Sequence, residues 1–214
     1  MTNKSKLYTF FVVVLFTINF SCLNDNSKIS DSKENMFAEK VAGKYHFLED
    51  NGTKIYLPSD FERISLTKYQ RLLDSISTKK EYKFETERLN SLSDMDGSLY
   101  IYFVKNTKST YTINTRPYIK FDKDNASQLL GLIKSNNDKV TKNSGAKFTK
   151  ITAKYGGNAN QQLFKAIYKI SGKRMKNDMF NSSYIISSNE KTVFIQITTA
   201  TKTDFDNFIE KMLL

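Results

Sequence analysis

His46 and Cys22 are the single histidine and the single cysteine of this 214-residue chain. These two residue types most often serve as metal ligands, general bases or nucleophiles in proteins. A histidine- or thiolate-based zinc site needs three or four such side chains. The composition therefore argues against a zinc centre of this kind and leaves His46 as the main candidate for acid–base chemistry.

His46 could in principle serve a Ser-His-Asp triad, since Asp50 and Ser59 lie near it in the sequence. The Gly-x-Ser-x-Gly motif that exposes a nucleophilic serine is not found in the chain. Tyr45 and Phe47 flank His46 in a strand-like alternation, and side chains alternate between the two faces of a strand. We expect the two aromatic rings to fill the core, which places His46 toward solvent without a catalytic role.

Two series of acidic residues look like the start of calcium-binding loops, Asp94-Met95-Asp96-Gly97 and Asp122-Lys123-Asp124. An EF-hand loop needs glycine at its sixth position and an acidic residue at its twelfth. These positions hold Leu99 and Lys105 in the first series, and Ser127 and Ile133 in the second. Turn and helix-cap roles are therefore the expected ones.

The remaining motifs are weaker. Glu81, Glu85 and Glu87 could form a carboxylate pair of the kind used in glycoside hydrolysis, but neighbouring lysines indicate a solvated helix. Gly156-Gly157 lacks the Lys-Ser/Thr that completes a phosphate-binding loop. The cluster Arg116–Lys120 mixes basic and aromatic residues as single-strand binders do. The sequence thus predicts no catalytic, cofactor-binding or metal-binding residues, and no nucleic-acid partner.

The first residues of the chain have the pattern of an export signal. Lys4 and Lys6 precede an apolar run of about 14 residues, from Leu7 to Phe20. A secretory signal has such a basic segment followed by an apolar one, and a membrane-spanning helix needs roughly 20 residues. We expect residues 1–21 to be removed after export and no spanning helix to be retained.

Asn19-Phe20-Ser21-Cys22 at the end of this run resembles the lipobox of bacterial lipoproteins of the Bacteroidetes type. The resemblance implies that the Cys22 thiol receives a diacylglyceryl group and the new amine a fatty acyl chain such as palmitate. Two or more acyl chains give stable membrane anchoring, so the resemblance implies a protein held in the cell envelope, at the outer membrane. It does not distinguish the periplasmic from the surface face. The alternative is an ordinary signal peptide with an incidental cysteine.

The formal net charge is +11, and loss of residues 1–21 leaves +9 because that segment holds two lysines and no acid. Such a surface can attract anionic lipid, lipopolysaccharide or nucleic acid. The lysines are scattered along the chain, however, and Lys, Asn, Ile and Ser are abundant throughout. We interpret the charge as a consequence of composition.

The chain divides into a signal (1–21), a polar tether (22–40) and one globular domain (41–214). Tether residues such as Asn24, Asp25 and Asn26 have little to bury, so this segment is predicted to be flexible. The domain should open with a hairpin whose turn is Asp50-Asn51-Gly52. A helix capped by Ser65 should follow, then a central strand over Leu99–Val104 that is apolar on both faces.

In the second half, Pro117 is expected to interrupt the strand over Tyr111–Phe121. A helix capped by Asp124 and closed by Gly145 should follow, then an antiparallel meander. The chain should end in a helix with a Thr203/Asp206 capping box. The meander strands are expected at Phe148–Tyr155, Leu163–Ile170, Tyr184–Ser187 and Thr192–Thr199, and the apolar stripe of the last helix at Phe205, Phe208, Ile209, Met212 and Leu213.

This order predicts a single α+β domain, an α/β/α sandwich whose largely antiparallel sheet is covered by helices on both faces. The domain shared by PsbP-type photosystem proteins and Ran-binding Mog proteins is similar to this chain at Tyr56-Leu57-Pro58, Phe61, Tyr184–Ile186, Thr192–Thr198, Asp204-Phe205 and Phe208-Ile209. Bacterial lipoproteins with this domain resemble accessory or binding proteins, not enzymes. The resemblance transfers no site residue to this chain.

Three functions are compatible with these features. The first is a non-catalytic binding or accessory module anchored in the envelope through lipid on Cys22, with an envelope protein or glycan as partner. The second is an envelope-acting hydrolase that uses carboxylates or a His46-based triad. The third is an immunity or inhibitor lipoprotein. We expect the first, with no cofactor, and a flat aromatic patch would favour the first or the third over the second.

Overall fold

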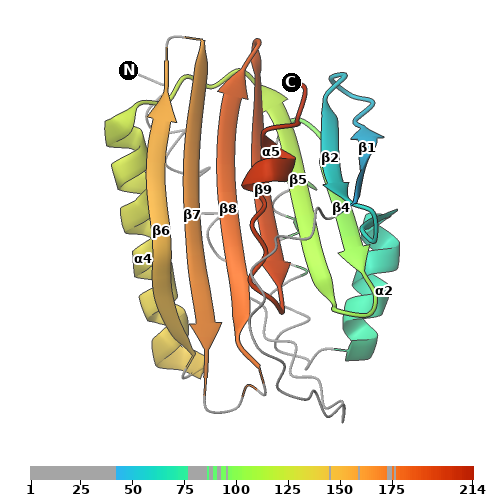
Figure 1. Ribbon diagram of the computed structural model, residues 1–214. Helices are drawn as coiled ribbons and strands as arrows, with labels where there is room; N and C mark the ends of the chain where they lie inside the picture. Colours follow the sequence, from blue (N-terminus) through green and yellow to red (C-terminus); the bar gives the residue numbers. More distant parts are fainter. Residues whose placement is uncertain are drawn as a thin grey trace.

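The computed structural model describes residues 42–76, 86, 89–90, 93–94, 96–144, 146–158, 160–172, 175 and 177–214. These residues form a two-stranded and a seven-stranded sheet with three named helices (Figure 1). The strands are β1 (Gly43–Phe47), β2 (Lys54–Pro58), β3 (Glu62–Ile64), β4 (Leu99–Val104), β5 (Ser109–Pro117), β6 (Lys147–Gly157), β7 (Gln161–Ser171), β8 (Met179–Ser188) and β9 (Lys191–Thr199). The helices are α2 (Leu66–Ile76), α4 (Lys123–Ser144) and α5 (Asp206–Ile209).

The large sheet is antiparallel throughout, with strand order β3-β4-β5-β9-β8-β7-β6. Strands β6 to β9 form the predicted meander, and β9 then pairs with β5, which brings the two halves of the chain together. The apolar strand β4 is covered on both faces as predicted, but it lies next to the short edge strand β3 and is not central. The central strand is β9, flanked by β5 and β8, and Pro117 is the last residue of β5.

The two faces of the sheet carry different layers, because side chains alternate along each strand. We call one face the helix side, where α4 and α2 pack against residues such as Phe194 and Ile101. The other face, called the hairpin side, carries Tyr100, Tyr111 and Ile195 and is covered by the β1–β2 hairpin and α5. In Figure 1 the hairpin and α5 lie in front of the sheet and α4 behind it.

The predicted α+β class with a largely antiparallel sheet is confirmed. The second helical layer of a sandwich, however, is reduced to α5, since the hairpin occupies most of that position. The helix starts follow the expected chemistry in part. Ser65 Oγ accepts a hydrogen bond from the Lys68 amide at 3.2 Å, while α4 is capped by Asp122 and not by Asp124: Asp122 Oδ1 accepts from the Asn125 amide at 2.8 Å.

The predicted C-terminal helix is much shorter than expected. Helix α5 ends at Ile209, and Leu213 forms an antiparallel bridge with Lys54 of β2. The capping box of Thr203 and Asp206 does not form, because Asp206 accepts hydrogen bonds from Lys165 Nζ and from Tyr184 Oη (3.0 Å). The Asp206 side chain thus bonds distant residues instead of the helix start, and Leu213 bonds β2 instead of continuing the helix. Within the described residues, no helix is long and apolar enough to cross a membrane.

Phe208 tests the role of α5 in the core. It is buried and its ring centroid lies 5.8 Å from that of Tyr56 and 5.9 Å from that of Phe205. Phe208→Ala should lower the free energy of unfolding by about 3–5 kcal/mol, as expected for a truncated core aromatic residue. Urea denaturation measures this, with Leu213→Ala as control, because the Leu213 side chain is 55% exposed and should matter by less than about 0.5 kcal/mol. Equal effects of the two changes would show that α5 lies outside the core.

Candidate functional site

The β1–β2 hairpin presents its apolar residues in an unexpected way. Paired residues in antiparallel strands share a face, and the register pairs His46 with Ile55 and Tyr45 with Tyr56. Ile55 and its face-mate Leu57 are fully buried against the large sheet. The aliphatic residues of β2 therefore decide which face of the hairpin is internal.

The prediction that Tyr45 and Phe47 fill the core is consequently wrong. Their side chains are 54% and 52% exposed, whereas His46 points inward and is half-buried. The alternation of side chains between the two faces of β1 was predicted correctly, but β1 alone does not show which of its faces meets the sheet. The inner face of β1 is set by its pairing with β2, because His46 lies opposite the buried Ile55.

The outer surface of the hairpin is an exposed aromatic patch. It is formed by Tyr45 and Phe47 of β1, Tyr56 of β2, and Lys211 and Leu213 of the C-terminal segment, and we call these five residues the hairpin face. The ring centroids of Tyr45 and Tyr56 lie 4.9 Å apart, and Lys211 Nζ lies 4.5 Å from the centroid of Tyr56. Leu213 is 55% exposed. Lys54 pairs with both Phe47 and Leu213 and lies between them on this face. Surface apolar residues are common singly, but several gathered on one face typically mark a contact site.

Gly43 allows the aromatic rings to pack flat on this face. A Cβ atom at Gly43 would lie 2.5 Å from the Tyr56 ring and 2.8 Å from the carbonyl oxygen of Leu57. The Tyr56 ring therefore occupies the space over the glycine and is itself stacked on Phe208. The hairpin face is thus held from below by the core and is not a loose group of side chains.

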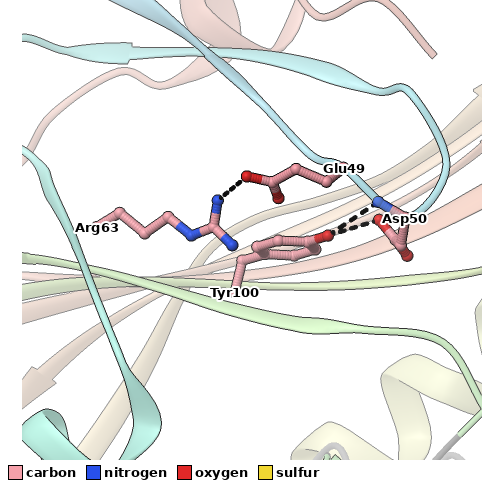
Figure 2. Close-up of polar contacts among 4 residues, drawn as sticks. All are labelled: Glu49, Asp50, Arg63 and Tyr100. Carbon is pink, nitrogen blue, oxygen red and sulfur yellow. Dashed lines mark hydrogen bonds and ion pairs between the residues drawn. The ribbon is translucent and has the colours of Figure 1, made fainter.

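A polar network fixes the turn of the hairpin to the large sheet (Figure 2). Tyr100 Oη donates a hydrogen bond to Asp50 Oδ1 at 2.7 Å and accepts one from the Asp50 amide at 3.3 Å. Thr115 Oγ1 donates to the other carboxylate oxygen, Oδ2, and accepts from the Ser98 amide at 3.1 Å. Because Thr115 is fully buried on the interior strand β5, Asp50 ties the turn to the interior of the sheet.

A second contact lies beside the first. Arg63 Nη1 donates to Glu49 Oε1 at 2.6 Å, and its guanidinium carbon lies 4.6 Å from the centroid of the Tyr100 ring. The hydrogen bond from Arg63 lowers the pKa of Glu49. Burial and then the hydrogen bond with Asp50 raise the pKa of Tyr100. Tyr100 therefore stays a neutral donor near neutral pH, as this network requires.

His46 does not belong to a catalytic set. Its ring lies edge-on to that of Tyr102, with centroids 4.8 Å apart, and Nε2 is buried without a hydrogen-bond partner. Asp50 is engaged by Tyr100 and Thr115, and no hydrogen bond joins His46 to Asp50 or Ser59 in the described structure. Burial, with a further contribution from the charges of Lys44 and Arg63, lowers the pKa of His46. Burial raises the pKa of Tyr102 to about 12, so its phenol does not ionise near neutral pH.

The other residues considered from the sequence are dispersed. Asp96 forms an ion pair with Arg116 at 3.4 Å, and Tyr118 Oη donates to Gln162 Oε1 at 3.2 Å. Among the described residues, no group of three or more His, Cys, Asp or Glu side chains is arranged to hold a metal ion. Cys22, Glu81, Glu85 and Glu87 lie outside the described residues.

A small cavity lies between α4 and the sheet. It is lined by α4 residues Leu129 and Ile133 together with Phe164, Phe194 and other sheet residues, and its volume is about 30 Å³. That volume holds about two water molecules. The cavity therefore does not provide a site for an organic substrate.

Comparison with solved structures identifies the architecture. The chain is similar to cyanobacterial PsbP (CyanoP) from Synechocystis sp. PCC 6803, with a TM-score of 0.50 and 9% sequence identity. The similarity covers 85% of this chain and 98% of that chain. The chain has a PsbP-like fold. No protein-family model and no curated protein sequence matches it. At this identity the likeness concerns the fold and transfers no function.

The hairpin face was missed by sequence reasoning, although one signal for it was present. Tyr45 and Phe47 alternate with Lys44 and His46 in β1, while Ile55 and Leu57 alternate with Tyr56 in β2. Only one face of the hairpin can be internal, and branched aliphatic residues on β2 compete with aromatic residues on β1 for that position. Comparing the two strands, given their register, would have predicted the exposed aromatic face.

Thr115 tests the attachment of the hairpin. Thr115→Val keeps the shape but removes the hydroxyl that bonds Asp50 and the Ser98 amide, so the free energy of unfolding should fall by about 1–3 kcal/mol. Thr110→Val in the same strand is the control, because the Thr110 hydroxyl has no hydrogen-bond partner among the described residues and the change should be nearly neutral. Urea denaturation of both variants gives the comparison. A neutral Thr115→Val would show that the Asp50 network contributes little to stability.

His46 makes stability depend on pH in a defined direction. Its pKa in the folded state is lowered below the ordinary 6.5, so the unfolded chain binds the proton more readily. The stabilising contribution is complete above pH 6.5 and declines as the pH falls through the folded-state pKa. Between pH 7.5 and 5, His46→Gln should therefore lose less unfolding free energy than the wild type. Since His46 is the only histidine, parallel profiles of the two proteins would contradict this assignment.

Proposed function

We propose that the protein is a membrane-anchored cell-envelope lipoprotein that acts as a non-catalytic binding module, with the hairpin face as its binding surface. The observation that carries the proposal is the exposure of Tyr45 and Phe47 on a hairpin that is itself firmly attached. Aromatic anchors on a rigid support contribute most of the energy in many interfaces, because little conformational entropy is lost on binding.

The chemistry of the hairpin face suits a macromolecular partner. Its rings provide flat apolar area, and Lys211 over Tyr56 adds a cation at its margin. Tyrosine and phenylalanine rings pack against apolar protein surfaces and stack on sugar rings, so an envelope protein or glycan fits this surface. A polymer or a protein surface does not need a deep pocket, which agrees with the small cavity beside α4.

The proposed anchor can place this surface within reach of the envelope. About 20 residues separate Cys22 from Ala42, where the described chain begins. At 3.3–3.6 Å per residue, they span at most about 70 Å. Strand β1 starts directly after Ala42, so the chain enters the domain at the hairpin. A lipid on Cys22 would thus keep the hairpin face within about 70 Å of the membrane.

Two variants of the full chain test the proposal in cells. Labelling with an alkyne fatty acid should tag the wild type and leave Cys22→Ser untagged, since the only thiol is then absent. Equal labelling of the two proteins would contradict the lipoprotein assignment.

The binding surface is tested by capture from detergent-solubilised envelopes. Phe47→Ser should lose at least tenfold of the partner recovered by the wild type, because the change removes one of the two exposed aromatic rings of β1. Ile151→Ser is the matched control: Ile151 is 42% exposed but lies on β6, at the far edge of the sheet. Partners recovered equally with Phe47→Ser and with the wild type would contradict the role of the hairpin face.

A further inference from the structure

Within the described part of the chain, the outer edge of β1 carries backbone groups without a strand partner. The Leu48 amide donates to the Thr53 carbonyl at 2.8 Å, and the Ser59 amide donates to the Ala42 carbonyl at 3.0 Å. Residues of an antiparallel strand bond alternately to one side and the other. Even-numbered residues of β1 therefore bond β2, whereas Gly43, Tyr45 and Phe47 direct their amides and carbonyls away from it.

This edge differs from the two edges of the large sheet. Strand β6 is long but has an irregular register between Lys150 and Thr152, and it carries lysines at 147, 150 and 154. Bulges and lysines are the usual protection of an edge strand against pairing. Strand β3 has three residues. Strand β1 has regular register over its whole length, and no strand among the described residues pairs with its outer side.

We propose that two copies of the chain pair through this edge, antiparallel, about a two-fold axis at Tyr45. The outward residues are spaced evenly around Tyr45, so the axis places Tyr45 opposite Tyr45 of the second copy and Phe47 opposite Gly43. All the outward amides and carbonyls of these three residues then find partners. The result is a four-stranded sheet in the order β2-β1-β1-β2.

Side chains on the paired strands are complementary. Phe47 of one copy faces Gly43 of the other, where the large ring meets a residue without a side chain and packs against the Tyr56 ring that covers it. On the inner face, Lys44 lies opposite the half-buried His46 and not opposite Lys44 of the second copy. The two hairpin faces become one continuous aromatic surface, and aromatic cross-strand pairs add stability to such a sheet.

Pairing goes beyond the proposed function, because the edge exists whether or not Cys22 carries lipid. A five-residue strand forms a small contact, and small interfaces are weak in free solution. If the chain is anchored as proposed, confinement to a membrane raises the effective concentration of the second copy and favours pairing. The binding module would then present a doubled hairpin face.

Cysteine trapping tests both the contact and its register. In the full chain carrying Cys22→Ser, Tyr45→Cys introduces the single thiol. Directly opposed residues in a bonded antiparallel pair have Cα atoms about 5.5 Å apart, within the range that a disulfide bridges. At high protein concentration under mild oxidation, Tyr45→Cys should form a covalent dimer in at least tenfold higher yield than Phe47→Cys, whose thiols would lie four residues apart along the strands. No dimer, or equal yields, would overturn the proposal.

A second measurement does not depend on a thiol. The Tyr45 amide points away from β2, so Tyr45→Pro removes an edge donor and leaves the hairpin ladder intact. In the Cys22→Ser background, sedimentation equilibrium should show a concentration-dependent dimer that Tyr45→Pro abolishes while the circular dichroism spectrum is unchanged. A monomer at all concentrations, or a dimer retained in Tyr45→Pro, would overturn the proposal. Neither test requires acylation, so failure here is separate from failure of the lipoprotein assignment.

Discussion

Burial of Leu48, Ile55 and Leu57 against the hairpin side of the sheet is the interaction on which the candidate site depends. A two-stranded hairpin is marginally stable in water by itself, so β1 and β2 keep their conformation because β2 completes the core of the large sheet. One face of β1 must follow β2 inward. The other face, with its two aromatic rings, has no position left in the core and remains at the surface.

Polar contacts of the turn and backbone contacts of the C-terminal segment then hold the hairpin in one position on the sheet. Asp50 links the turn to β4 and β5, while the Leu213 bridge holds β2 from its other side. Helix α5 fills the space between these supports, with Phe208 stacked under Tyr56. Among the residues that the structure describes, the same packing leaves the outer edge of β1 without a neighbouring strand. Burial of Ile55 and Leu57 thus accounts for the exposed rings, and the position of β2 between β1 and the C-terminal segment accounts for the free edge.

Sequence patterns predicted the local structure well where it depends on neighbouring residues. The alternation in β9, the helical spacing in α4 and the turn at Asp50-Asn51-Gly52 all gave the observed elements. Predictions were wrong where a residue distant in the sequence determines the conformation or the exposure of a side chain. Asp206 binds Lys165 and Tyr184 instead of capping a longer helix, and His46 faces inward because it is paired with Ile55. The candidate site could not be derived from β1 alone, since its exposure is set by a comparison between two strands and by their docking on the sheet.

Amide hydrogen exchange in β1, followed by NMR, tests most directly the claim that its outer edge is free. In dilute protein the amides of Lys44 and His46, which face β2, should exchange slowly, and those of Tyr45 and Phe47 should exchange at least tenfold faster. The difference should shrink as the protein concentration rises and the edges of two copies pair. Equal, strong protection of all four amides at every concentration would show that another part of the chain covers the edge, and would contradict the account.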